Sequence, residues 1–379
     1  MDNFTHSLVG LAAAKSGLEK LSPGATTLCI IAANAPDADV AVIAFADRWT
    51  FLQHHRGITH AIVGVAVISV LLPSLFYLGD LILSRLKPRP PRVKFGGLLL
   101  ASILVSATHP LLDWTNNYGI RFFLPWNSHW SYGDLVFIVD PFIWVLLGSA
   151  CFLLTVRTKL QRLGWLFIGV VLTLIMFLSP RGGNLPAPWL IRVVWVSVVI
   201  GLFVLFRNDV GQKLGMNLAR AALVLLVVYW AALGFAHSSA LSRAREEAEL
   251  VKSPGEVVSR IVAMPTLANP LRWDCVFETD KASYRFNLRL LADSSVAKPV
   301  RYEKPSGKTA QALNAVSSDR RTQIFLGFAR FPVTKLSDPD CATQTLVELA
   351  DLRYTEPGTQ RGTFSLDIPI DCTTLINGR

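Results

Sequence analysis

The stretch HHRGITHAIVGVAVISVLLPSLFYL, residues 54–78, joins a histidine-rich polar motif to a long apolar run that begins at Ala61. An apolar run of about 20 residues is long enough to cross the hydrocarbon core of a membrane as a helix. Neutral imidazole is a good metal ligand, and ionisable groups beside hydrocarbon usually have a function. The stretch therefore indicates either a metal site at a membrane boundary or an interfacial loop with ordinary polar residues.

Composition extends the membrane interpretation to most of the chain. Of the 379 residues, 51% are hydrophobic and only 17% are charged, which is unusual for a soluble protein. Apolar runs of roughly 17–22 residues recur up to residue 237, and none follows. We expect an α-helical polytopic membrane protein with a C-terminal soluble, mainly β domain of the α+β class. The expected regions are a membrane-embedded metal-site region at 1–145, additional transmembrane helices at 146–237 and an extracytoplasmic soluble domain at 238–379.

Hydropathy predicts six full spans and two ambiguous segments before them. Segments 5–20 and 24–45 could cross as a short helical pair or re-enter the membrane, because NAPDAD interrupts the second. The chain opens with an acid and has no basic N-terminal region, so it does not resemble a cleavable signal peptide. The full spans are expected at 58–79, 96–115, 135–156, 164–180, 187–206 and 218–236.

Basic residues gather in alternate loops. Loops 80–95, 157–163 and 207–220 hold eleven Lys and Arg, whereas the intervening loops hold four. Basic loops stay in the cytoplasm, so the protein is expected in the bacterial inner membrane with its tail in the periplasm or outside the cell. The basic excess is thus a topology signal, and no nucleic-acid partner is predicted. The other segments expected on the outer side are 47–57, 116–134 and 181–186.

The tail after residue 237 alternates apolar and polar residues in several short runs. SRAREEAELVKS predicts a helix, and the later runs predict strands. One disulfide among Cys275, Cys341 and Cys372 is possible on an oxidising side, and three cysteines do not reveal which two pair. Cys29 and Cys151 lie in spans and are expected to be buried apolar residues. The predicted strands are RWDCVFE, SYRFNLRLL, QIFLGFARF, LVELADLRY and TFSLDIP.

THPLLDW, residues 108–114, carries the sharpest local signal for a site. His109 and Asp113 are four residues apart, so on a helix they share one face and can converge on one ion. A buried His–Asp hydrogen bond is the alternative. The orientation deduced from Lys and Arg alone places these two residues at the same membrane depth as other histidines and aspartates. This agreement favours a metal site, and the candidate ligands are His6, Asp37, His55, His60, His109, Asp113 and Asp140.

Histidine and aspartate together suit Zn²⁺, or Mn²⁺, better than Mg²⁺ or copper. A bridging aspartate would permit two ions, which could activate a water molecule and stabilise an oxyanion. Arg56 could hold a phosphate oxygen, although an arginine facing lipid headgroups is at least as common. Asp39 or Asp134 could orient the attacking water.

Five motifs in order resemble the bacterial family of LexA-regulated, membrane-bound, metal-dependent hydrolases (YdjM-like). They are FTHSLVG, NAPDAD, HHRGITH, HPLLDWTNNYG and GDLVFIVDP, and they cover about residues 1–145. The order of ligands is also similar, more distantly, to zinc-dependent phospholipase C and the S1/P1 nucleases. That likeness implies His6, Asp37, His60, His109 and Asp113 as metal ligands, with Asp113 bridging. The later histidine pair of those enzymes has no counterpart after residue 130, which argues against a three-metal site.

These observations favour a metal-dependent phosphoester hydrolase at the outer membrane boundary, where a lipid phosphate such as a phospholipid or polyprenyl phosphate is within reach. A metal-dependent scaffold whose tail binds an envelope protein partner is the main alternative. A transporter is the third. It is disfavoured because the ligands cluster on one side and residues 164–236 contain no acid within a predicted span.

Overall fold

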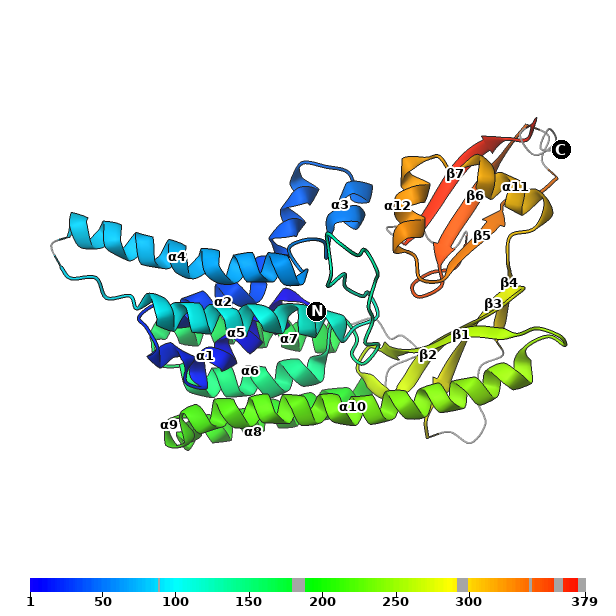
Figure 1. Cartoon of the computed structure of the whole chain (residues 1–379). Coiled ribbons are helices and arrows are strands. Elements are labelled where there is room, and N and C mark those ends of the chain that lie inside the picture. Colours follow the sequence, from blue (N-terminus) through cyan, green and yellow to red (C-terminus); the bar gives the residue numbers. More distant parts are fainter. Residues whose placement is uncertain (88, 179–187, 292–298, 341–342, 358–363, 374–379) are drawn as a thin grey trace. The chain divides into compact units, whose positions relative to one another are not determined.

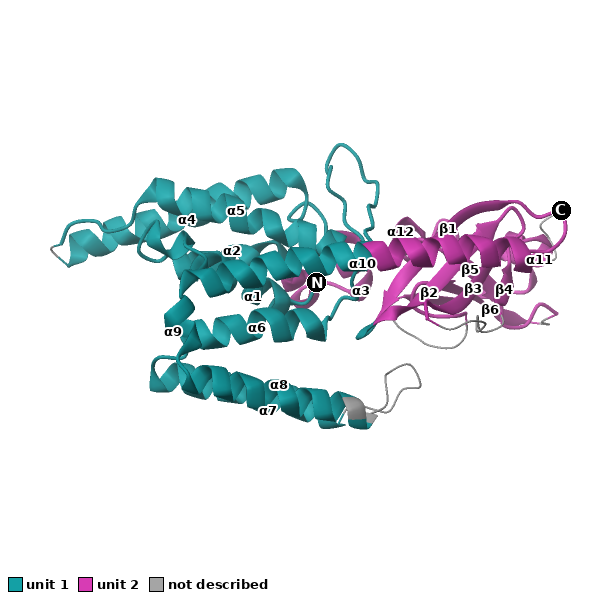
Figure 2. Cartoon of the chain, turned by 90° about the horizontal axis from the view of Figure 1, so that it is seen from below, with its two compact units in different colours: residues 1–38, 56–234, 267–269 teal, residues 39–55, 235–266, 270–379 magenta. Residues whose placement is uncertain are grey.

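The computed structural model describes residues 1–87, 89–178, 188–291, 299–340, 343–357 and 364–373, and Figure 1 shows its elements. The chain divides into two compact units, coloured in Figure 2. The first contains Met1–Ala38, Arg56–Gly234 and Leu267–Asn269. The second contains Asp39–His55, Phe235–Thr266 and Pro270–Arg379. Segment 39–55 therefore belongs with the tail, which the sequence did not indicate.

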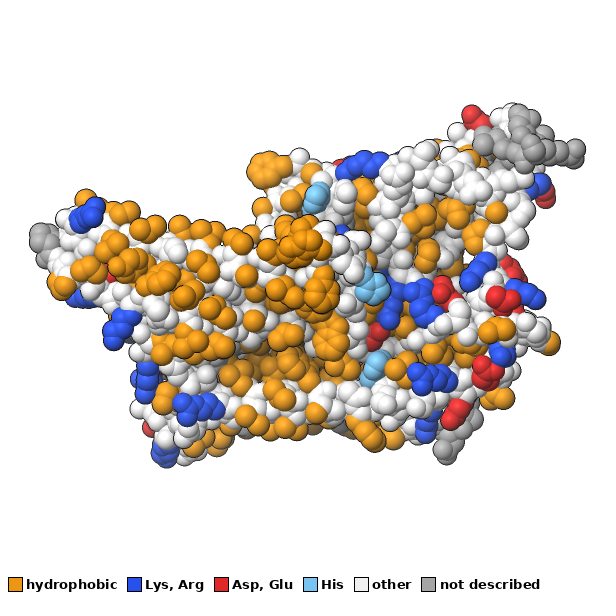
Figure 3. Space-filling view, viewed as in Figure 1, with side chains coloured by type: hydrophobic (Ala, Val, Ile, Leu, Met, Phe, Trp, Pro, Cys, Tyr) orange, Lys and Arg blue, Asp and Glu red, His pale blue; other side chains and the backbone are white. Residues whose placement is uncertain are grey.

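The first unit is built of helices. Four helices of the described chain are long and apolar enough to cross a membrane: Ala25–Ala44, Ile62–Leu86, Phe95–Trp114 and Met216–Val251. Apolar side chains cover much of the helical region in Figure 3, as expected for helices that face lipid. The predicted polytopic helical fold is confirmed. The helices are α1 (Asn3–Lys15), α2 (Ala25–Asn34), α4 (Ile62–Leu86), α5 (Phe95–Trp114), α6 (Pro141–Thr155), α7 (Lys159–Leu178), α8 (Pro188–Arg207), α9 (Val210–Leu214) and α10 (Met216–Val251).

Segment 24–45 is a helix of two kinds. The α-helix α2 ends at Asn34 and continues as the 3-10 helix η2 (Ala35–Ala44), which carries Asp37; a second 3-10 helix, η1 (Leu18–Lys20), follows α1. A 3-10 helix rises about 2.0 Å per residue against 1.5 Å in an α-helix, so it changes which side chains face inward. The change of helix type at NAPDAD therefore determines where Asp37 points.

Small residues bring α1, α2 and α5 close together. α1 packs against α2, and α2 packs against α5. A Cβ atom on Gly10 would lie 2.6 Å from the carbonyl oxygen of Cys29, so only glycine permits this approach. Leu28 and Leu98 fill the core between these helices. Close packing through small residues is the usual basis of helix association in membranes, and here it places α1, α2 and α5 side by side.

The second unit contains two antiparallel sheets. The first has the order β1 (Val258–Thr266), β2 (Asn269–Thr279), β3 (Ala282–Arg289) and β4 (Val300–Glu303). The second has the order β5 (Pro332–Leu336), β6 (Gln344–Asp351) and β7 (Ser365–Asp371). Trp273 and Phe277 of the first sheet are fully buried in a cluster with alanines of the C-terminal part of α10. The remaining helices of this unit are α3 (Arg48–His54), α11 (Gly307–Ala315) and α12 (Arg320–Phe328).

Four of the five predicted tail strands lie on observed strands, namely β2, β3, β6 and β7, and the predicted helix 242–253 falls mostly on α10. The prediction for QIFLGFARF is wrong, because most of that run forms α12. Asp319 caps α12 through the backbone N–H of Arg321, and Phe325 and Phe328 are buried three residues apart, which is helical spacing. An apolar run of this length does not distinguish a strand from a buried helix.

The cysteines differ in state. Cys372 is disulfide-bonded, whereas Cys29, Cys151 and Cys275 are free and buried. Burial raises the pKa of the Cys275 thiol, which makes it a poor nucleophile. Cys341 lies outside the described residues.

Candidate metal centre

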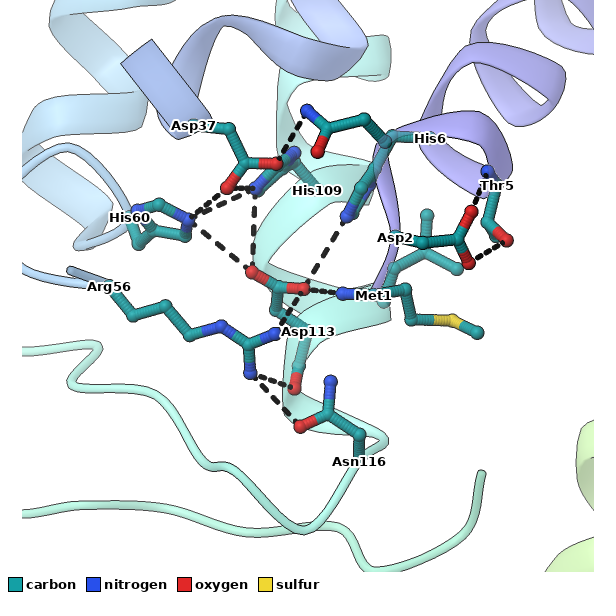
Figure 4. A network of polar contacts seen from close by, with 12 residues as sticks. Met1, Asp2, Thr5, His6, Asp37, Arg56, His60, His109, Asp113 and Asn116 are labelled. Carbon is teal, nitrogen blue, oxygen red and sulfur yellow. Dashed lines mark hydrogen bonds and ion pairs between the residues drawn. The ribbon is translucent and has the colours of Figure 1, made fainter. Parts of the chain in front are cut away.

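The site begins on α5, where His109 and Asp113 face the same side of the helix (Figure 4). Both are essentially inaccessible to solvent. His109 Nδ1 lies 2.7 Å from the carbonyl oxygen of Ala33, an acceptor, so this nitrogen carries the proton. His109 Nε2 therefore presents its lone pair 3.4 Å from Asp113 Oδ2. A histidine fixed in this way by a backbone carbonyl has the arrangement that metal-binding histidines adopt.

Asp37 and His60 join this pair from two other segments. His60 Nε2 lies 3.2 Å from Asp37 Oδ1, 3.4 Å from Asp113 Oδ2 and 3.1 Å from His109 Nε2. His109 Nε2 lies 3.5 Å from Asp37 Oδ1. Four side chains from η2, the loop before α4 and α5 thus direct one atom each toward a common point.

These separations fit a single tetrahedral metal ion. Bonds of about 2.0–2.1 Å to Zn²⁺ place tetrahedral ligand atoms about 3.3 Å apart. Five of the six separations among the four inward atoms are the distances just given, and they span 3.1–3.5 Å. The buried Asp113 Oδ2 has no hydrogen-bond partner in the described chain, as expected for an oxygen that faces an ion.

Each ligand is held from outside by its other polar atom. Asp37 Oδ2 accepts a hydrogen bond from Asn3 at 3.0 Å, and His60 Nδ1 lies 3.0 Å from Thr59 Oγ1. Asp113 Oδ1 pairs with Arg56 Nη2 at 3.1 Å and contacts the Met1 amino group. Outer partners of this kind orient the inward atoms before an ion binds.

His6 lies on the other side of Asp113. Its Nε2 is 3.4 Å from Asp113 Oδ1, and its ring stacks on His109 with centroids 3.8 Å apart. The side chain is fully buried, and among the described residues neither ring nitrogen has a hydrogen-bond partner. A buried imidazole without a partner is costly, so His6 can serve as a further metal ligand beside Asp113.

Arg56 is buried against the end of α5. Its Nη1 donates to the Asp113 carbonyl at 3.3 Å, to Asn116 Oδ1 at 3.0 Å and to the Gly119 carbonyl at 3.1 Å. Its guanidinium also lies over the Tyr118 ring, 4.6 Å from the centroid. The backbone of Arg56 is left-handed, with φ 53°, a conformation that is unfavourable without such support. Its contact with a substrate oxygen stays a prediction; the observed contacts hold Asp113 in place.

Sequence reasoning did not single out Asn116. Its Oδ1 accepts from both Arg56 and the backbone N–H of Tyr118, which fixes the orientation of the amide and leaves Nδ2 without a partner in the described chain. TNNYG directly after a helix end contained a usable signal, since Asn and Gly there favour a turn stabilised by a side chain.

The remaining predicted site residues are Asp39, His55, Asp134 and Asp140, and one atom each of Asp39 and His55 lies within 4.8 Å of Asp37 in a second possible ligand group. Asp39 Oδ1 lies 3.2 Å from His55 Nδ1, so these two residues pair with each other. Asp134 is buried, with a left-handed backbone at φ 53°. Asp140 caps α6 by accepting from the N–H groups of Phe142 and Ile143, and its second oxygen accepts from Tyr229 at 2.9 Å. These contacts give Asp140 a structural role, and its place among the metal ligands stays a prediction.

Comparison with known proteins supports the membrane-protein interpretation of the N-terminal half of the chain. Residues 1–184 match the family model described as YdjM inner membrane protein. The protein YfhP of Bacillus subtilis (strain 168), described as uncharacterized, is 29% identical over 155 residues, which is 38% of this chain and 43% of the relative. The chain thus spans less than half the length of that relative, and no solved structure matches. The predicted resemblance to the YdjM-like family is confirmed for this region, whereas the likeness to phospholipase C and the nucleases stays a prediction.

Proposed function

We propose that the protein is a membrane-bound, metal-dependent hydrolase that cleaves a phosphoester of a lipid-linked or envelope phosphate at the outer face of the inner membrane. One observation carries the metal dependence. Atoms of Asp37, His60, His109 and Asp113 are separated by nearly the distances that a tetrahedral ion requires, and each residue is held from outside.

The ion is Zn²⁺, with Mn²⁺ as the alternative, because two imidazoles and two carboxylates suit these metals. Such an ion makes a water molecule acidic near neutral pH and stabilises developing negative charge on oxygen. The chain's own contribution is to fix the carboxylate of Asp113 through Arg56 and to offer His6 as a further ligand. Asp134 is the proposed residue that orients water, on account of its burial and constrained backbone.

The lipid-phosphate substrate rests on location and on the family expectation. His60 and Asp113 lie near the ends of α4 and α5, which are apolar enough to cross a membrane, so a phosphate carried by a lipid is the expected substrate class. Arg56 adds a buried positive charge beside Asp113, which favours an anionic substrate.

A metal-stabilised scaffold is the second candidate, and one observation favours it. Four protein ligands complete a tetrahedron, and closed sets of this kind are typical of structural zinc. The unpartnered His6 beside Asp113 Oδ1 favours the hydrolase instead, because it extends the site beyond a closed set.

Phosphate release separates these two candidates. Zn²⁺-loaded and metal-stripped protein in detergent are incubated with phosphatidic acid and with a polyprenyl phosphate, and released phosphate is measured. We expect release only by the loaded protein, restored when Zn²⁺ is returned. Loaded protein that binds stoichiometric Zn²⁺ yet releases no phosphate from any phosphoester offered would favour the scaffold.

The outer location is tested by topology. An alkaline phosphatase fused after Arg379 should be active, and a green fluorescent protein fused there should be dark, because eleven basic residues in three loops hold those loops in the cytoplasm. A fusion within loop 80–95 is the matched control and should give the opposite pair of results. A fluorescent C-terminal fusion would place the metal centre on the cytoplasmic side and remove envelope phosphates from the proposal.

A further inference from the structure

Segment 39–55 occupies a special place in the chain. It lies between Asp37 and His60, two residues of the proposed metal centre, yet it forms a compact unit with the tail. One residue separates it from Asp37, and Arg56 follows it directly. Whatever fixes this segment therefore also restricts two parts of the centre through the covalent chain.

The two ends of the segment are held together. Asp39 Oδ1 lies 3.2 Å from His55 Nδ1 across 16 positions of sequence. The His55 ring stacks on Phe51 with centroids 4.7 Å apart, and the His55 N–H donates to the Phe51 carbonyl at 2.7 Å. The pair closes a loop of about the size of compact surface loops whose ends lie close together.

The middle of the segment is anchored on the tail. It forms α3, which packs against α12. Asp47 caps α3 through the Thr50 N–H at 2.7 Å, and Arg320 of α12 donates to Thr50 Oγ1 at 2.7 Å. Trp49 and Leu52, on one face of α3, are 5% and 1% exposed.

Apolar burial on α3 is expected to outweigh the ion pair to α12. Arg320 and Asp47 are each about half exposed, and ion pairs between such groups contribute little. Burial of a tryptophan and a leucine contributes far more. The control residue in the same segment is Phe45, whose side chain is 90% exposed.

We propose that segment 39–55 is a positioning strap, closed by Asp39 and His55 and anchored by α3 on α12, through which the tail fixes Asp37 and Arg56 for metal binding. The proposal gives the tail a role in the membrane-embedded site. It rests on the proposed metal centre.

Zn²⁺ affinity of the full chain in detergent, measured by competition with a chelator, tests the strap. Trp49→Ala should weaken Zn²⁺ binding about tenfold to 100-fold, the range found when residues that orient metal ligands are removed. Phe45→Ala should bind like wild type. Unchanged affinity in folded Trp49→Ala protein would overturn the strap.

Variants of His55 give a second test of the strap, which remains informative if Trp49→Ala does not fold. An asparagine amide can occupy the place of imidazole Nδ1 and donate to Asp39, whereas it is a weak ligand for Zn²⁺. We expect His55→Ala to lose about tenfold in affinity and His55→Asn to stay within about twofold of wild type. Equal losses in both variants would make His55 a ligand and overturn its role in the strap. If the wild-type protein binds no Zn²⁺, the metal centre itself is overturned. If the wild-type protein binds Zn²⁺ and the Trp49 and His55 variants bind it equally well, only the strap is overturned.

Discussion

Alanine at His109 or at Asp113 is expected to reduce Zn²⁺ affinity by at least about 100-fold, more than the loss of a residue that only orients a ligand. His109→Ala removes an inward lone pair that is already fixed by the Ala33 carbonyl. Asp113→Ala removes a carboxylate and leaves the Arg56 guanidinium buried without its counter-charge. Metal content by elemental analysis and affinity by chelator competition would be measured on purified protein.

His237→Ala is the matched control, since this histidine contacts Trp273 in the tail unit and should retain wild-type metal content. Monodisperse elution and an unchanged helical circular dichroism spectrum identify variants that remain folded. Full metal occupancy in folded His109→Ala and Asp113→Ala protein would mean that the pair is a structural hydrogen bond.

Arg56→Lys is expected to lower both Zn²⁺ affinity and phosphate release, by about tenfold to 100-fold for the affinity. The guanidinium reaches three oxygens through Nη1 and Asp113 Oδ1 through Nη2. A lysine keeps the charge, but its ammonium group is a single point with three donors and lacks the planar fork. Affinity and phosphate release would be determined on the same samples.

The two hypotheses for the role of Arg56 predict different results in this experiment. If Arg56 contacts only a substrate oxyanion, the lysine variant should bind Zn²⁺ normally and lose release alone, on the scale of one oxyanion donor. If Arg56 instead holds Asp113 in place, the lysine variant should lose Zn²⁺ affinity as well as phosphate release. A variant equal to wild type in both measurements would exclude both roles.

Local pattern was sufficient for the helices and for the centre of the site. Runs of apolar residues predicted α4, α5 and α10, and helical spacing alone placed His109 beside Asp113. These features depend on residues within a few positions of each other, and periodicity records such relations directly. To predict that Asp37 and His60 lie at the same membrane depth as His109 and Asp113, the orientation deduced from the basic loops was also needed.

Other features depend on partners that no local pattern records. The pairing of Asp39 with His55, the cap that Asp140 forms with help from Tyr229, and the oxygens around Arg56 are all tertiary contacts. The sequence shows that each charged group needs a partner, because burial of a lone charge is costly, but it does not show which partner the fold supplies. The same reason explains why segment 39–55 was not assigned to the tail.

The contact between α3 and α12 joins residues that the ribosome makes at very different times. Asp47 precedes Arg320 by 273 positions, and at roughly 5–20 residues per second that gap corresponds to tens of seconds of synthesis. During this interval α12, the helix on which α3 packs, has not yet been made. We therefore expect this region to reach its final packing only after the tail has been made.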